Sequence, residues 1–368
     1  MSFINKYLRN FKPYKVASHK IWNVLPDARK EILKLDWNEA TVPPTELVKK
    51  NLAKLTKDGS FYQLYPSTYN ERLLELLESY TNIPKDNLQY FGSSDSLHEY
   101  IAKMYIDVGD PIVIMWPSYD NFRLTAEING ADIKFFRMTD EFEFDQVAFM
   151  EFIENIEPSL VYICNPNNPT GSLLSTKYIE LLLNKFNQTM FLIDEAYSEF
   201  SGVSAKELVL DYENIIISRT MSKAFAIANF RFGYMIGSED NIKYISTIRN
   251  PKNITTFSQV AAMSVLEDIP YMMQYVKNIR ETRDWFAQEL SSYELLDVFS
   301  GEGNFVMIRF PSIDQKMDFI AYLESKDIFV RDLRQDDLVA SCVRITIGTR
   351  EQMEKVLNEI ESWFLICG

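Results

Sequence analysis

Histidine and cysteine are scarce in this sequence of 368 residues. It contains two histidines, His19 and His98, and three cysteines, Cys164, Cys342 and Cys367. Neither histidine lies near a cysteine or a carboxylate at a spacing that binds zinc, so we expect no metal site. A mechanism that needs a histidine relay lacks its parts as well. Three cysteines with no disulfide pattern are most simply explained by a reduced, cytoplasmic setting.

Long apolar runs and positive charge are also lacking. No stretch approaches eighteen uninterrupted apolar residues, so we expect no membrane-spanning helix. The first twenty residues carry no apolar core of signal-peptide length, and we expect an ordered arm there. Lys and Arg total 38 against 52 Asp and Glu, a net charge of −14. This balance disfavours nucleic acid or an anionic membrane as a partner, but it leaves room for a local basic pocket that binds a small anion.

Glycine is sparse too, with 12 residues, and no glycine fingerprint follows an early strand. A nicotinamide-dependent dehydrogenase is therefore disfavoured. What the chain does have is 46% hydrophobic residues, ample for a packed interior. Its length suits one large domain with a smaller companion.

The middle of the chain alternates short apolar runs with longer amphipathic segments. This pattern predicts an α/β fold whose mainly parallel sheet is covered by helices on both faces. The expected strands are 111–116, 160–164, 189–194, 214–218 and 232–237, and expected helices between them include 147–156 and 175–186.

After about residue 250 the rhythm changes, which predicts a second, smaller α/β unit. Its expected elements are a helical stretch over 256–294, strands at 304–310, 328–333 and 342–348, and helices at 316–325 and 351–364. We therefore divide the chain into an N-terminal arm (1–44), a large cofactor-binding domain (45–250) and a small C-terminal domain (251–368).

Three successive predicted strands end in polar motifs. They are "NPNNPTG" (165–171), "DEAYSEF" (194–200) and "RTMSKAFAIANFRFGY" (219–234). Ligands of an open parallel sheet bind beyond the carboxyl ends of its strands, so these motifs would meet at one crevice.

Each residue of these motifs also has an ordinary explanation. Lys223 could be a surface lysine, Asp194 a helix cap, and Asn168 a turn former. Asn165 and Asn167 have no explanation from the sequence beyond turn chemistry. The occurrence of all three motifs in this order argues for a shared function.

With "CNPNNPTG", "DEAY" and "TMSKAF" followed by "RFGY", the sequence resembles the fold-type I pyridoxal-phosphate enzymes. It is most similar to the class I and II aminotransferases, in particular their histidinol-phosphate aminotransferase branch. The resemblance extends from "KPY" near residue 14 to "VRITIGTREQ" near residue 352. It implies a pyridoxal 5'-phosphate cofactor and a homodimer with a shared active site.

The resemblance also implies roles for the residues that bind the cofactor ring. Lys223 would bind the cofactor aldehyde covalently and later act as a general base. Asp194 would lie against the pyridine nitrogen and keep it protonated. Asn168 and Tyr197 would hydrogen-bond the phenolic oxygen of the ring. Tyr119 matches an aromatic that stacks on the ring; the alternative is a core tyrosine.

A phosphate site is expected where "LQYFGSSDSLHEY" changes from strand to helix. The amides of Ser93 and Ser94 would face an anion at a helix N-terminus, although "GSSD" alone could be an ordinary helix cap. Further phosphate donors implied by the resemblance are Thr220, Ser222 and Arg231. Tyr65 matches a tyrosine that reaches the cofactor phosphate of the neighbouring subunit, and Tyr62 is the alternative candidate for this contact.

For the substrate, Arg344 in "CVRITIG" matches an arginine that clamps a carboxylate. Arg331 resembles a second anion contact used for a substrate phosphate, but it could be a surface arginine beside Asp332. Tyr14 and Asn38 are the remaining candidate substrate contacts.

The chain also departs from this branch at three places. "LDWNEATVPP" keeps the first Asn and the Glu of an Asn-Glu-Asn-Pro run but not the second Asn. "AFAIANFR" lacks the usual glycines after Lys223, and "RNPKNITTF" lacks the aromatic after its proline. In this family these three regions lie near the substrate. The departures therefore concern which substrate is bound, and not the cofactor chemistry.

The leading hypothesis is an aminotransferase that acts on an amino acid, with glutamate as one candidate, and a small carbonyl acceptor that could be phosphorylated. One alternative is decarboxylation of a phosphorylated amino acid with the same cofactor. Another, from a different class, is a non-catalytic relative that binds pyridoxal phosphate.

Overall fold

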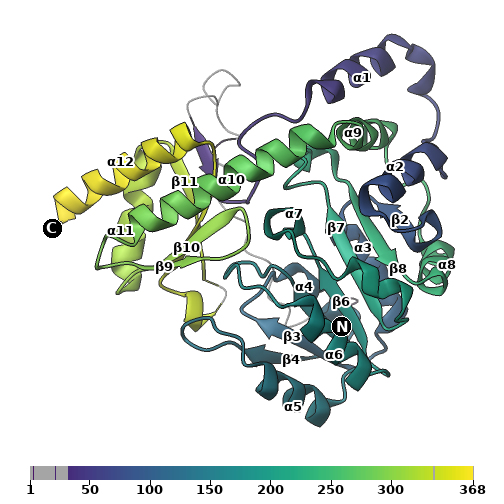
Figure 1. Cartoon of the computed structure of the whole chain (residues 1–368), viewed down its shortest axis with the longest axis horizontal. Coiled ribbons are helices and arrows are strands. Elements are labelled where there is room, and N and C mark those ends of the chain that lie inside the picture. Colours follow the sequence, from purple (N-terminus) through teal and green to yellow (C-terminus); the bar gives the residue numbers. More distant parts are fainter. Residues whose placement is uncertain (1–2, 4–20, 22–31, 335, 368) are drawn as a thin grey trace.

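The computed structural model describes residues 3, 21, 32–334 and 336–367. In this part of the chain the strands form two sheets, one of seven strands and one of five. The two sheets belong to two units, and helix α10 (Ile269–Leu290) runs from one unit to the other (Figure 1).

The larger sheet has the strand order β2-β8-β7-β6-β5-β3-β4. Neighbouring strands are parallel from β7 to β4, whereas β8 runs antiparallel to both β7 and β2. The bounds are β2 Leu88–Phe91, β3 Pro111–Trp116, β4 Asp132–Arg137, β5 Leu160–Cys164, β6 Met190–Asp194, β7 Ile215–Thr220 and β8 Gly233–Gly237.

Helices cover both faces of this sheet, because alternate residues of each buried strand point to opposite sides. In β5, Val161 and Ile163 join a core that includes α5 and α6, whereas Leu160 and Tyr162 join a second core with α3, α4 and α8. The bounds are α1 Glu46–Lys57, α2 Glu71–Thr81, α3 Ser94–Tyr105, α4 Asn121–Ile128, α5 Gln146–Ile156, α6 Thr176–Lys185, α7 Ser198–Ser201, α8 Glu239–Ile248 and α9 Thr256–Leu266.

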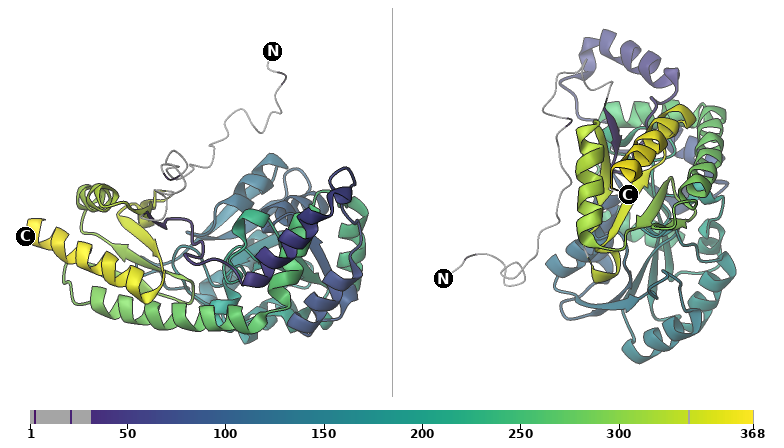
Figure 2. Two further views of the ribbon diagram at one scale, coloured as in Figure 1. Left: turned by 90° about the horizontal axis from the view of Figure 1, so that it is seen from above. Right: turned by 90° about the vertical axis from the view of Figure 1, so that its left-hand side faces the viewer.

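The smaller sheet has the order β1-β11-β12-β10-β9. Strand β1 is parallel to β11, and all other neighbours are antiparallel. In Figure 2, α10 runs along this unit, and α12 lies near α10. The bounds are β1 Leu33–Leu35, β9 Asp297–Ser300, β10 Phe305–Arg309, β11 Ile328–Asp332, β12 Cys342–Thr346, α11 Ile313–Ser325 and α12 Arg350–Cys367.

Most elements expected from the sequence are present, with one break and a few additions. The helical stretch over 256–294 is two helices, α9 and α10. Pro270 is the second residue of α10, and proline is favoured in the first turn of a helix, so a new helix begins there. The edge strands β1, β4 and β9 were not predicted. Strand β1 comes from the segment assigned to the N-terminal arm and pairs with β11 in the smaller sheet. The domain boundaries at residues 44 and 250 stay a prediction.

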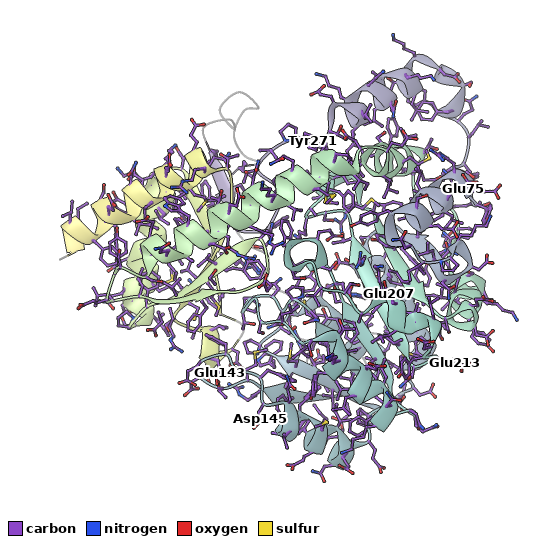
Figure 3. The ribbon with its side chains drawn as sticks, viewed as in Figure 1. Glu75, Glu143, Asp145, Glu207, Glu213 and Tyr271 are labelled. Atoms are coloured by element: carbon purple, nitrogen blue, oxygen red, sulfur yellow. The ribbon has the colours of Figure 1, made fainter. Side chains whose placement is uncertain are left out.

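Acidic side chains lie on the outside of the larger unit. Figure 3 labels Glu75, Glu143, Asp145, Glu207 and Glu213, which are all exposed. In the described part of the chain, no helix is long and apolar enough to cross a membrane. The same residues include no cluster of three histidine, cysteine or acidic side chains that could hold a metal ion.

Candidate functional site

The ends of β5, β6 and β7 lie side by side, as the strand-end argument predicts. Cys164 is in register with Asp194, and Asp194 with Ser218. The three polar motifs therefore start from neighbouring positions at one edge of the sheet.

Lys223 lies just beyond β7 and is partly buried. Its Nζ donates a hydrogen bond of 2.7 Å to the carbonyl oxygen of Trp37. Burial lowers the pKa of Lys223 to about 8, an effect that the carboxylate of Glu39 opposes and the guanidinium of Arg344 reinforces. A substantial fraction of this amine is therefore neutral near physiological pH, as a nucleophile or base requires.

Asn168 and Tyr197 belong to a hydrogen-bonded series that crosses from the larger to the smaller unit. The Tyr197 hydroxyl accepts from Asn168 Nδ2 at 3.1 Å and from Asn38 Nδ2 at 2.9 Å. Arg344 donates through Nη1 to Asn168 Oδ1 and through Nη2 to the carbonyl of Asp36 at 2.7 Å. Burial raises the pKa of the Tyr197 phenol above its ordinary value, so the hydroxyl stays protonated.

The carboxylate of Asp194 is buried at the end of β6. Its Oδ2 accepts from the Tyr162 hydroxyl at 2.9 Å and lies 4.0 Å from His98 Nε2, while Oδ1 accepts from the amide of Ala196 at 3.2 Å. Burial raises the pKa of Asp194, and the nearby His98 and the hydrogen bond from Tyr162 partly offset this rise.

The expected anion site lies where β2 turns into α3. Ser93 is the N-cap of the helix and adopts a φ of 132°, a conformation that L side chains rarely take. A Cβ on Gly233 would lie 2.5 Å from the amide nitrogen of Ser94, so only glycine lets β8 pass this close. Strain and close packing thus fix the amides of Ser93 and Ser94 at the start of a helix.

Arg231 and Tyr119 meet at one carboxylate beside this helix start. Arg231 Nη2 donates to Asp95 Oδ2 at 3.2 Å, and the Tyr119 hydroxyl donates to Asp95 Oδ1 at 3.1 Å. On β7, Thr220 Oγ1 donates to Ser222 Oγ at 2.9 Å and accepts from the Ser222 amide at 3.1 Å.

The other candidates lie in different places. Arg331 on β11 is the direct strand partner of Arg344 on β12, which puts two arginines at neighbouring positions. Tyr65 lies in an exposed loop, with Lys252 Nζ 4.7 Å from the centre of its ring. Tyr14 falls outside the described residues.

Asn165 and Asn167 do more than the turn chemistry expected of them. Asn165 binds the backbone of Leu174 through both side-chain atoms. Asn167 is fully buried; its Nδ2 donates to the Pro117 carbonyl at 2.9 Å and to Thr170 Oγ1 at 2.8 Å, and its Oδ1 accepts from Ser118 Oγ at 2.8 Å. These bonds fasten the loop that carries Asn168.

Sequence reasoning missed three residues beside the site: Asp95, His98 and Tyr162. Tyr162 could have been found, because it alternates with Cys164 on one face of β5 and a buried tyrosine needs a hydrogen-bond partner. Asp95 falls within "GSSD", but its position gives no sign of the Arg231 that it binds 136 residues later.

Comparisons with known proteins match nearly the whole chain. A family model described as aminotransferase class I and II matches residues 30–360. A dihydroxyacetone phosphate transaminase of Campylobacter jejuni is 39% identical over 98% of this chain and 96% of its own length. A histidinol-phosphate aminotransferase of Ruminiclostridium cellulolyticum is 32% identical over 99% of this chain and 98% of its own length.

A solved structure shares the fold. The histidinol-phosphate aminotransferase from Sinorhizobium meliloti, in complex with pyridoxal-5'-phosphate, superposes with a TM-score of 0.87 at 21% identity and covers 99% of both chains. The α/β architecture expected from the sequence is thereby confirmed.

Proposed function

This chain belongs to the class I and II aminotransferase family, and from that premise we propose its reaction. The protein uses pyridoxal 5'-phosphate to move an amino group from an amino acid, with glutamate as the first candidate, to a small phosphorylated ketone. One observation carries the proposal: the hydrogen-bonded series from Arg344 through Asn168 to Tyr197, at the strand ends that bear Lys223 and Asp194.

The donor set of the site fits this cofactor. Bound pyridoxal phosphate supplies an aldehyde that takes up the amino group and a protonated ring that accepts electrons. The buried carboxylate of Asp194 suits the ring nitrogen, and the Tyr162 hydroxyl and Ala196 amide hold that carboxylate in place. Asn168 and Tyr197 offer an amide and a hydroxyl to the phenolic oxygen of the ring.

Lys223 is the residue that holds the aldehyde carbon and then moves a proton. Its lowered pKa leaves part of the amine neutral at physiological pH, which allows it to attack a carbonyl carbon. Once a substrate amino group has replaced it, the free amine would take the proton from the substrate Cα and pass it to the former aldehyde carbon, and it would carry the proton the other way in the reverse half-reaction.

The cofactor phosphate would be held by the start of α3 and by β7. The amides of Ser93 and Ser94 supply donors at a helix N-terminus. Thr220, Ser222 and Arg231 supply hydroxyls and a guanidinium, and Tyr119 supplies the aromatic face that covers the ring.

The acceptor is inferred from the two curated relatives. Dihydroxyacetone phosphate, and the ketone that corresponds to histidinol phosphate, both place the carbonyl next to a phosphorylated hydroxymethyl group. A donor amino acid has a carboxylate at that position. Arg344 and Arg331, paired across β11 and β12, would bind either anion, and Asn38 would line the same end of the site. Tyr14 stays a candidate for this role.

Neither alternative function is favoured. The curated relatives at 39% and 32% identity are named as a transaminase and an aminotransferase, not as decarboxylases. A non-catalytic relative would not need the lysine, aspartate and arginine that this chain retains.

We also propose a homodimer in which Tyr65 reaches the cofactor phosphate of the partner subunit. Support comes from the exposed aromatic side chains of its loop. A cytoplasmic location stays a prediction from cysteine usage; Cys164 and Cys342 are buried free thiols. The negative net charge still argues against a nucleic-acid or membrane partner.

Absorbance of the purified protein tests this function. With pyridoxal phosphate the wild type should show a visible band that an amino donor abolishes and that dihydroxyacetone phosphate restores. Lys223→Ala should lack this band and this cycle while it still binds the cofactor. A wild type that binds no pyridoxal phosphate, or that releases carbon dioxide without forming a keto acid, would overturn the proposal.

A further inference from the structure

We propose that Asp336 is a positioning residue that ties together the two sides of the site, a role that rests on the function proposed above. Its carboxylate joins the segment that follows Arg331 in the smaller unit to the ends of β3 and β4 in the larger unit. Through this tie it fixes the anion-binding strands relative to the residues that hold the cofactor.

The tie consists of three short hydrogen bonds from the larger unit. Trp116 Nε1 donates to Asp336 Oδ2 at 2.7 Å. Arg137 donates through Nη1 to Oδ2 and through Nη2 to Oδ1, both at 2.7 Å. Such a two-pronged guanidinium contact fixes orientation as well as distance. The side chain of Asp336 is only 11% exposed, although that of Arg137 is 51% exposed.

On the side of the larger unit, Asp336 binds residues that lead into the site. Trp116 ends β3 and is followed at once by Pro117 and Ser118, which bind Asn167, and by Tyr119. Arg137 ends β4, the neighbouring edge strand. Asp336 therefore holds the base of the segment that supports the Asn168 loop and carries Tyr119.

On the side of the smaller unit, the same segment is anchored from within. Lys316 is fully buried on α11; its Nζ donates to Asp332 Oδ1 at 2.6 Å and to the carbonyl of Ala340. Asp336 itself accepts from the amide of Leu338 at 2.9 Å. Lys316 thus holds Asp332 and Ala340 from one side, while Trp116 and Arg137 hold Asp336 from the other.

The charge of Asp336 suits this task. The hydrogen bonds from Leu338, Trp116 and Arg137 outweigh the effect of burial and hold the pKa of the carboxyl below its ordinary value. The carboxylate stays ionised, and the tie stays formed, throughout the pH range in which Lys223 titrates.

Arg137→Gln in the cofactor-loaded enzyme tests the tie. We expect KM for the amino donor and for dihydroxyacetone phosphate each to rise about threefold to fivefold, as for loss of a partly exposed ion pair. We expect kcat and the Kd for pyridoxal phosphate to stay within about twofold, because the groups that perform the chemistry are intact. Asp336→Asn should give the same pattern, and the double variant should add little to either change.

Lys134→Gln is the matched control, since Lys134 lies on the same strand and pairs with exposed Asp132. It should leave both KM values unchanged. Hydrogen exchange gives a readout without turnover: the amides of 337–341 should exchange faster in Arg137→Gln and at the wild-type rate in Lys134→Gln.

The outcomes separate this proposal from the proposed function. A wild type that transfers no amino group refutes the function, whereas a wild-type KM in an active Arg137→Gln enzyme refutes the tie. Unchanged exchange of 337–341 refutes the tie in either case. A parallel loss of cofactor affinity, kcat and thermal stability would show a merely structural role and also refute it.

Discussion

At the scale of single residues, the lowered pKa of Lys223 destabilises the folded protein, and the role proposed for this amine requires that lowered pKa. Lowering the pKa from 10.5 to about 8 means that the folded protein binds this proton less tightly than the unfolded chain does. The penalty is therefore fully present below about pH 8 and disappears as the pH rises toward 10.5. It corresponds to at most about 3–4 kcal/mol, and the partial exposure of Lys223 reduces this to about 1–2 kcal/mol.

We therefore expect Lys223→Met to stabilise the cofactor-free protein by about 1–2 kcal/mol near pH 7 and to lose this advantage near pH 10. Urea denaturation of both proteins at the two pH values measures the difference. Lys316→Met is the matched control, because Lys316 is buried with the carboxylate of Asp332 as its partner and its loss should destabilise the protein. A pH-independent gain in Lys223→Met would contradict the charge argument.

The candidate site also shows which residues a sequence can reveal. Lys223, Asp194 and Asn168 lie at strand ends, so the position of each follows from local pattern and from one rule about parallel sheets. The contacts of Asp95 and Tyr162 depend on packing between helix and sheet, which local pattern does not determine. The carbonyls of Asp36 and Trp37 give no sequence signal at all, because every residue has one.

At the scale of elements, the loop over residues 165–172 is fastened by Asn167 rather than by its prolines alone. Asn167→Ala would leave the Pro117 carbonyl and the Ser118 hydroxyl buried without this partner. We expect a loss of about 2–4 kcal/mol in the free energy of unfolding, measured by urea denaturation.

Asn184→Ala is the control for this substitution. Asn184 also donates two hydrogen bonds, to the Glu180 carbonyl and the Tyr212 hydroxyl, but it lies on the surface of α6. Water can replace those bonds, so the change should stay within about 0.5 kcal/mol. Equal effects of the two substitutions would disprove the fastening role of Asn167.

An element could be predicted from the sequence when the residues of the element itself carry its signal. The buried strands β3 and β5 match the predicted ranges residue for residue, because continuous apolar runs between polar segments are a local feature. Strand β1 could not be predicted, since three residues form a strand only by pairing with β11, nearly 300 residues later. The break between α9 and α10 had a local signal in Pro270 that the apolar pattern concealed.

At the scale of the whole molecule, the loop before α2 presents aromatic side chains to the outside in a fixed form. Tyr62, Leu64, Tyr65 and Tyr69 are 60–79% exposed. The backbone beneath them is held from inside, because Gln259 Nε2 donates to the Ser67 carbonyl at 3.0 Å and Arg249 Nη2 to the Thr68 carbonyl at 3.3 Å. A held loop with an exposed apolar surface suits the proposed contact with a second subunit.

Mixed dimers test whether Tyr65 acts across that contact. Tyr65→Ala should weaken cofactor binding in its partner, and Lys223→Ala should abolish activity in its own subunit. A mixed dimer of the two would then contain one site with both Lys223 and Tyr65 intact. Refolding the variants together should restore about a quarter of wild-type activity, since about half of the dimers would be mixed and each would have one complete site. Tyr62→Ala is the control because Tyr62 is similarly exposed in the same loop. Tyr62→Ala alone should keep its activity. If Tyr62→Ala alone is inactive and regains activity when mixed with Lys223→Ala, or if the Tyr65→Ala mixture is no more active than its parents, the contact belongs to another residue.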